Sequence, residues 1–187
     1  MVFQEDVQTV TEQTARLPRL DHARRDQGTT WRFQPVVEAL QAFRGVQCPV
    51  AVTPVAALGD LTRFNNPRQL MHSLGLTPSA YASGPRRQPG SMTKTGHPHA
   101  RRALVEGAWA YRYPAKVSRH LPLRLEKRPA ALQASRWKAH VRLCTRSRQL
   151  MATGKQAQQV VVAIARECSA CMGALAKQVV VPPQASR

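Results

Sequence analysis

The chain has 187 residues, a size that suits one domain or one compact core with an appended arm. Apolar residues make up 43% of the chain, enough to bury a core, and this excludes wholesale disorder. Its 28 Lys and Arg side chains outnumber 10 Asp and Glu, which gives a formal net charge of +18.

The charge is concentrated in one part of the chain. Residues 1–60 carry 6 basic and 7 acidic side chains, whereas residues 61–187 carry 22 basic side chains and only 3 acidic ones. So many positive side chains in one segment repel one another, and a bound polyanion would reduce this repulsion. We therefore expect a nucleic acid as the partner. A ribosomal-type protein and a basic protein of membrane surfaces are the alternatives.

No segment of the sequence is typical of a membrane protein. The chain opens with Met-Val-Phe-Gln-Glu-Asp, whose acids are the reverse of a secretory leader. The longest apolar stretch, 160–181, is interrupted by Arg166, Glu167 and Lys177, so we do not expect it to span a membrane. Four cysteines fit reduced thiols better than a disulfide framework, and we expect a cytoplasmic protein without a membrane partner.

The first 34 residues predict a short helix and a linker. Apolar residues at spacings of 4 and 3 run from Phe3 to Leu17, a heptad-like seam that stops before Pro18. Such a seam is typical of the end of a longer coiled-coil helix. Residues 18–34 are polar and predict a linker.

Proline and glycine then divide the chain into short helices. We expect helices over 35–44, 49–58 and 67–74, each ended by a glycine. Pro54 is unfavourable inside the second of them, because it removes a hydrogen bond and costs about 3 kcal/mol. The third begins well, since Asn66 can cap it and Pro67 occupies its first position.

The second half predicts three amphipathic helices around proline-rich segments. One starts at Pro98 after a Gly- and Pro-rich basic loop over 77–98, and the last follows Gly154. The middle one, over 135–151, has an apolar face that we expect to be buried: Trp137, Val141, Cys144 and Met151. Its other face is basic: Arg136, Lys138, Arg142, Arg146 and Arg148.

These elements predict a mainly α fold: a compact helical domain with a Gly/Pro-rich basic loop and none or one short β-hairpin. The expected organisation is a coiled-coil helix end and linker (1–30), a core (31–112), a basic Pro-rich linker (113–134), a helical pair (135–181) and a tail (182–187).

The segment 83–97 has the composition of an anion-binding loop. Its glycines free backbone N–H groups to converge on an anion, and it leads into the start of the helix at Pro98, where unpaired N–H groups also favour phosphate. It lacks the Gly-Lys-Ser/Thr of a Walker A loop. A solvated basic loop is the alternative. The side chains expected to bind nucleic acid are Arg86, Arg87, Lys94, Arg101, Arg102, Arg136, Lys138, Arg142, Arg146 and Lys155.

Three other groups of residues allow a functional or a structural interpretation. Cys168 and Cys171 have the spacing of half a zinc site, but both fall on a buried stripe, which favours core packing. His97 and His99 could hold a metal, although contact with phosphate fits a solvent-facing loop better. Trp137 and Trp109 could stack on bases, but helical spacing favours a place in the core.

Several short motifs occur in a fixed order over residues 31–180. They are Leu58-Gly59-Asp60-Leu61, Pro67-Arg68-Gln69-Leu70, Gly75-Leu76-Thr77-Pro78, Ser83-Gly84, Thr93-Lys94-Thr95-Gly96, Arg101-Arg102-Ala103-Leu104 and Gly154-Lys155. The ordered set resembles the transposase domain of the IS110/IS116/IS902 family of insertion sequences.

The resemblance implies a chemistry and a set of partners. It makes Ser83 the nucleophile that attacks a DNA phosphodiester and holds the strand end as a phosphoserine ester. It implies DNA and an element-encoded guide RNA as partners, in the bacterial cytoplasm at the nucleoid, with a homo-oligomer or pairing with a full-length transposase. The family's other half is a RuvC-like domain whose four acids bind a divalent metal such as magnesium, joined through a long coiled coil.

The sequence departs from the family pattern in ways that limit the expected activity. After residue 60 the acids are Glu106, Glu126 and Glu167, so we expect no metal cofactor in this chain. His97 stands where the family has Asn, and Gln47 interrupts a turn that resembles a helix-hairpin-helix. These departures predict a truncated carboxy-terminal half that does not transpose alone. A nucleic-acid-binding remnant, an inhibitor of an intact transposase and a degenerate product destabilised by Pro54 are the alternatives.

Overall fold

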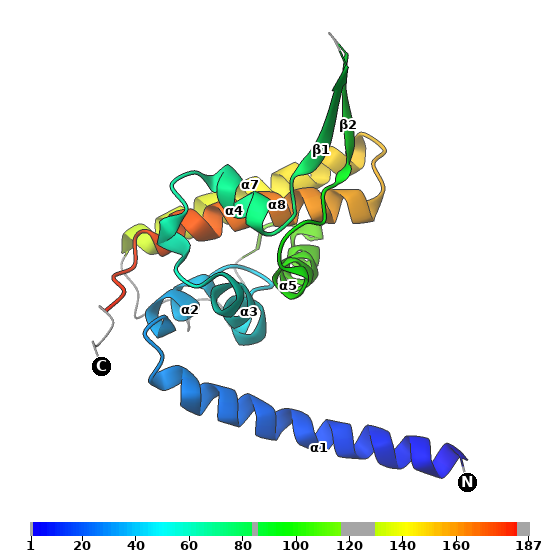
Figure 1. The fold of residues 1–187 in the computed structure, drawn as a ribbon, viewed down its shortest axis with the longest axis vertical. Helices are drawn as coiled ribbons and strands as arrows, with labels where there is room; N and C mark the ends of the chain where they lie inside the picture. The colour runs from blue at the N-terminus through cyan, green and yellow to red at the C-terminus, as the bar shows by residue number, and fades with distance from the viewer. Residues whose placement is uncertain (1, 84–85, 117–129, 183–187) are drawn as a thin grey trace. The chain divides into compact units, whose positions relative to one another are not determined.

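The computed structural model describes residues 2–83, 86–116 and 130–182 (Figure 1). The chain divides into two compact units, residues 1–34 with 182–187 and residues 35–181. Over the described residues the fold is mainly α, as predicted, with one sheet of two strands.

The first unit is dominated by one long helix, α1 (Val2–Thr29). The sequence predicted that this helix ends before Pro18 and that a linker follows, and this is wrong, because α1 continues through Pro18. One proline removes a single backbone hydrogen bond and can bend a helix without ending it. Beyond it, His22 and Asp26 pair at 2.7 Å across one turn. Along the seam, Phe3 is 78% exposed.

The second unit begins with short helices, α2 (Gln34–Leu40), α3 (Cys48–Leu58), the 3-10 turn η1 (Leu61–Arg63) and α4 (Pro67–Ser73). The helix predicted to reach residue 44 ends at Leu40, since the N–H groups of Ala42 and Phe43 bond three residues back and tighten the chain into turns. The predicted start of α4 is confirmed, because the Asn66 side chain accepts from the N–H of Arg68.

α3 accommodates Pro54 inside the helix and buries it. Its neighbours Ala51 and Val55 have no exposed surface. The proline ring therefore packs in the core, and this burial offsets part of the cost of the missing hydrogen bond.

Residues 78–92 form an antiparallel hairpin of β1 (Pro78–Ser83) and β2 (Arg86–Met92), the short hairpin that the predicted fold left open. Pro78 pairs with Met92 and Ser83 with Arg86, with an irregularity between Pro78 and Ala80. Figure 1 shows that the hairpin projects from the helices of the second unit. Gly84, the second residue of the Ser-Gly pair, lies outside the described residues.

Three longer helices complete the unit: α5 (Pro98–Ala108), continued by the 3-10 turn η2 (Trp109–Arg112), α7 (Ala130–Ala152) and α8 (Ala157–Ala176). α8 packs against α4, α5 and α7. By length and composition it could cross a membrane, but 56% of its apolar window is buried inside the protein, as in a core helix. Most of the predicted linker 113–134 lies outside the described residues, but residues 130–134 already belong to α7, so the linker ends earlier than predicted.

The buried face of α7 differs from the predicted one. Trp137, Val141 and Met151 were expected in the core, but they are 37%, 39% and 48% exposed. Leu143 and Leu150, one heptad apart, are buried instead, and the helix is rotated to place them inside. This rotation also buries polar side chains on the same stripe: Arg136, His140 and Ser147.

Gly75 is a glycine that we expect the fold to require, because of its backbone conformation and its close neighbours. Gly75 has φ +64°, and a Cβ there would lie 1.9 Å from the backbone oxygen of Thr95. We expect Gly75→Ala to lower the free energy of unfolding by about 3 kcal/mol or more, because it adds a backbone clash to the left-handed strain. Denaturant unfolding followed by circular dichroism measures the loss.

Gly154→Ala is the matched control. Gly154 has a similar φ of +77°, but no atom lies within 4 Å of its added Cβ. We expect this variant to lose only about 1 kcal/mol, the left-handed strain alone. Equal losses in the two variants would show that the close approach at Gly75 is not required.

Candidate nucleic-acid interface

The base of the hairpin is formed by two segments that cross, 73–77 and 93–97. The N–H of Thr93 donates to the oxygen of Thr77 at 3.0 Å, and the N–H of Lys94 donates to that of Gly75 at 3.2 Å. Gly96 takes part in the same crossing, because a Cβ there would lie 2.1 Å from the oxygen of Ser73. Two motifs that are separate in the sequence therefore make one structural unit.

Lys94 lies at the centre of this unit with a strained backbone. Its φ is +56°, in the left-handed region that favours glycine, and it is the non-glycine residue with positive φ among those described. Its side chain is exposed. A residue kept in this conformation at a cost of about 1–2 kcal/mol is a candidate for a functional side chain.

Arg101, on α5, ties the crossing segments together. Its Nη1 donates to the backbone oxygen of Leu74 at 3.2 Å and to that of Lys94 at 3.0 Å. The side chain is half-buried, whereas its neighbour Arg102 is exposed. Arg101 thus has a structural role, and its contact with nucleic acid stays a prediction.

His97 is the N-cap of α5. Its Nδ1 accepts from the N–H of Ala100 at 3.4 Å, which satisfies one of the unpaired donors at the helix start. The side chain of Asn performs the same task. The histidine at this position is therefore compatible with the local structure, although the family pattern has Asn there.

The predicted nucleophile and its nearest cations lie at the far end of the hairpin from this base. Ser83 pairs with Arg86, and Ala82 pairs with Arg87 across the two strands. The structure describes these residues by their backbone. The pairing of the two strands thus places Ser83, Arg86 and Arg87 at the same end of the hairpin. Their contacts with nucleic acid stay predictions.

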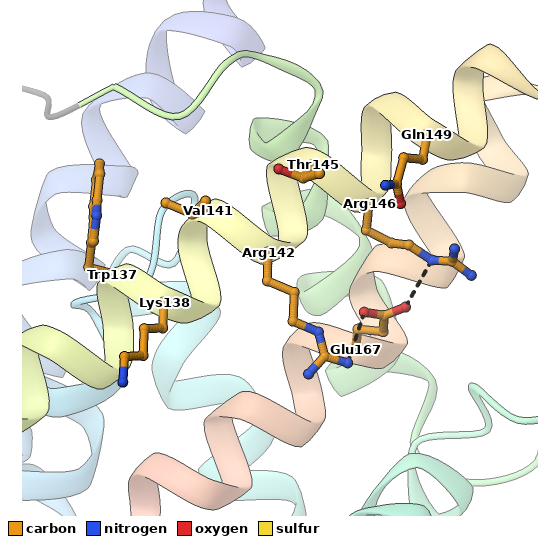
Figure 2. Close-up of a pocket in the computed structure, with 8 residues that line it drawn as sticks. All are labelled: Trp137, Lys138, Val141, Arg142, Thr145, Arg146, Gln149 and Glu167. Atoms are coloured by element: carbon orange, nitrogen blue, oxygen red, sulfur yellow. Dashed lines mark ion pairs between the residues drawn. The ribbon is translucent and has the colours of Figure 1, made fainter.

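A groove runs along α7 and is closed on one side by α8 (Figure 2). Arg142 Nη2 lies 3.6 Å from one carboxylate oxygen of Glu167, and Arg146 Nε lies 3.4 Å from the other. The residues that line the groove are Trp137, Lys138, Val141, Arg142, Thr145, Arg146, Gln149 and Glu167. Three cations and one carboxylate leave this groove with a net charge of about +2. Lys155, also predicted to bind nucleic acid, is exposed after α7.

Arg136 is placed differently from the prediction that put it on the exposed basic face. It is only 8% exposed, and its Nη1 donates to the backbone oxygen of Ala42 at 3.4 Å. Its Nε has no hydrogen-bond partner, and burial lowers the pKa of the guanidinium. The rotation of α7 explains the change, and Lys138, Arg142 and Arg146 remain on the surface.

His140 packs against Trp137 of the groove, a contact that no feature of the sequence indicated. It is 3% exposed, and its ring stacks on Trp137 with centroids 5.5 Å apart and an interplanar angle of 26°. Neither ring nitrogen has a hydrogen-bond partner. Burial, then the charges of Arg44 and Arg136, lower the pKa of His140. The indole therefore packs on an imidazole whose burial disfavours the protonated form.

The cysteines pack as the structural interpretation predicted, at least at Cys168. This thiol is 3% exposed and lies 3.9 Å from the hydroxyl oxygen of Tyr111, and burial raises its pKa to about 12. Cys171 is half-buried. Within 2–83, 86–116 and 130–182, no three His, Cys, Asp or Glu side chains are grouped to hold a metal ion. The described residues therefore do not form a site for the divalent metal that the family resemblance implies.

The turn that resembles a helix-hairpin-helix is used for packing inside the unit. Gly45 has φ +75°, and a Cβ there would lie 2.2 Å from the backbone oxygen of Gly107 on α5. Gly107 in turn would meet Gly45 at 3.0 Å. The close backbone approach that glycine permits is thus made to α5, and its use toward DNA stays a prediction.

Comparison with known proteins places the hairpin inside a recognised domain. Residues 37–120 match the model described as the transposase IS116/IS110/IS902 family. The chain is 41% identical over 148 residues to the Sinorhizobium fredii protein named "Putative transposase y4qE". The matched region is 79% of this chain and 38% of that protein, so the chain spans well under half of its relative.

His140 predicts a pH dependence of stability. Its pKa is lowered from the ordinary value of 6.5, so below pH 6.5 the unfolded chain takes up a proton that the folded chain does not. We expect the free energy of unfolding to fall between pH 7 and pH 5, by at most about 1.4 kcal/mol per pH unit. In His140→Phe, which keeps a ring beneath Trp137, this decline becomes shallower.

Denaturant unfolding at several pH values measures this effect, with His72→Gln as the control. His72 is exposed, so its replacement leaves the decline unchanged. If His140→Phe shows the same decline as the native protein, the burial of His140 does not control it.

Proposed function

We propose that the chain binds DNA for the transposition of an insertion sequence, because residues 37–120 match the model of the transposase IS116/IS110/IS902 family. The projecting hairpin is the observation that carries the proposal. It lies within the matched segment, and its base is held by Gly75, Gly96 and Arg101. Ser83, Arg86 and Arg87 belong to this one element.

Electrostatics supports a nucleic acid as the partner. Residues 61–187 contain 22 basic and 3 acidic side chains, and one of those acids, Glu167, is already paired with two arginines. Neutralised phosphates release counterions, which makes binding favourable and sensitive to salt. DNA is the proposed substrate, and a guide RNA is a proposed second partner.

Ser83 is proposed as the nucleophile. Its oxygen would bond to phosphorus, the bond from phosphorus to the leaving deoxyribose oxygen would break, and that oxygen would take up a proton. Arg86, Arg87 and Lys94 would stabilise the charge on the phosphoryl oxygens. A serine hydroxyl is a weak nucleophile that needs a base to accept its proton. We propose that carboxylates of the RuvC-like domain that the resemblance implies, which are not part of this sequence, complete the site, and that this chain alone does not cleave DNA.

The proposed binding is tested by a salt titration. With six or more phosphate contacts, we expect the affinity of the chain for a labelled duplex to fall by ~10³ or more between 50 and 200 mM salt. Fluorescence anisotropy measures it. A flat salt profile would contradict binding through a basic surface.

The proposed chemistry is tested with Ser83→Ala. This variant keeps the affinity of the native chain, because one hydroxyl contributes little to phosphate binding, and it forms no covalent adduct with DNA in any preparation in which the native sequence forms one. Denaturing gels detect the adduct. An adduct that survives Ser83→Ala would remove the serine mechanism and leave a binding module; cleavage by the purified chain with magnesium would overturn the expected inactivity.

A substitution of Lys94 can separate effects on stability from effects on binding. In Lys94→Gly the left-handed strain is relieved, so we expect the free energy of unfolding to stay unchanged or to rise by up to about 1 kcal/mol. The loss of one phosphate contact is expected to reduce the slope of log affinity against log salt by about 1. Lys94→Arg keeps the charge and is the control. If Lys94→Gly binds with the native slope, its side chain does not contact phosphate.

A further inference from the structure

The groove on α7 carries two parallel rows of side chains of different chemistry. Figure 2 shows Lys138, Arg142 and Arg146 along one side of the helix. Trp137, Val141 and Thr145 follow the adjacent side. Both rows repeat every four residues, so each step advances by about 6 Å along the helix. A basic row thus lies beside a row that begins with an exposed indole.

The indole of Trp137 is held in a fixed position and is open to solvent. One face of the ring stacks on His140, which is itself 3% exposed, while Trp137 remains 37% exposed. Val141, one turn further, is 39% exposed. A fixed aromatic ring loses little side-chain entropy when a flat ligand stacks on it.

Glu167 orients the basic row. Its two carboxylate oxygens lie within 3.6 Å of Arg142 and 3.4 Å of Arg146, and its own side chain is only 18% exposed. The arginine side chains are more exposed, at 71% and 47%. The two guanidinium groups therefore keep unpaired N–H donors for an incoming phosphate, and the groove keeps a positive charge.

We infer that this groove binds a single-stranded segment of nucleic acid, with an unpaired base stacked on Trp137 and its phosphates on Lys138, Arg142 and Arg146. The inference rests on the proposed function and names the form of nucleic acid that this surface takes. In a duplex the flat faces of the bases are stacked on one another, so a duplex would use the basic row and leave the indole without a partner. A single strand uses both rows.

The test measures affinities of the full chain for four labelled probes: a 20-nucleotide oligothymidine, the same length of oligouridine, an abasic oligomer of equal charge and a 20-base-pair duplex. The first two separate DNA from RNA as the source of the strand. We expect Trp137→Leu to weaken binding of both base-containing strands by about tenfold, within the range that one stacked base contributes. Binding of the abasic strand and of the duplex is expected to change less than about twofold.

Two variants control the interpretation. Trp137→Phe keeps an aromatic face and is expected to recover most of the single-strand affinity, which separates stacking from a folding defect. Arg148→Gln removes an exposed cation of α7 outside the groove, whereas Arg142→Gln removes one inside it. We expect Arg142→Gln alone of these two to lower the salt dependence of single-strand binding.

The outcomes that overturn the inference differ from those that overturn the proposed function. Equal weakening of all four probes by Trp137→Leu, or no change in any, would exclude base stacking while DNA binding stands. A Trp137→Leu variant that alters the sedimentation coefficient and not the affinities would assign this face to contact between protein chains instead. Failure of the native chain to bind any probe would reject the proposed function itself.

Discussion

The hairpin can project from the helices only because two chain segments approach each other closely at its base. Residues 73–77 and 93–97 exchange backbone hydrogen bonds there, and Gly75 and Gly96 leave no room for a Cβ. Arg101 then bonds one backbone oxygen from each segment. Because β1 and β2 pair with no other strand among the described residues, this crossing determines the direction of the hairpin and hence the position of Ser83, Arg86 and Arg87.

Features of the sequence that act through local geometry, such as helix caps and turn glycines, were the ones that could be interpreted. Asn66 and Pro67 predicted the start of α4 because a cap acts through a local hydrogen bond. The glycines before and after residues 77–95 marked sharp turns. The hairpin between them was left open and its strands were not located, since Pro89 and Gly90 interrupt the alternation that identifies a strand.

The site on α7 was harder to predict, because apolar residues of this helix are exposed while some of its polar residues are buried. A helical wheel places Trp137 and Val141 inside, yet Leu143 and Leu150 occupy the core and turn them outward. This rotation has an energetic cost, because it buries polar atoms of Arg136 and His140 that lack hydrogen-bond partners. Hydrophobic periodicity alone predicts that polar residues stay outside and apolar residues inside. The exposure of the Trp137 indole therefore follows only from the packing of α7 against the other helices.

Glu167 connects the two electrostatic features of this half of the chain. Without a carboxylate between them, Arg142 and Arg146 would repel each other on adjacent turns of α7. An ion pair with solvent-exposed arginines contributes little to stability, about 0–1 kcal/mol, so we ascribe to Glu167 mainly the orientation of the two guanidinium groups. One acid shared by two cations leaves charge available for phosphate. A second acid at this position would lower the net charge of the groove from about +2 to about +1 and weaken the proposed binding of a polyanion.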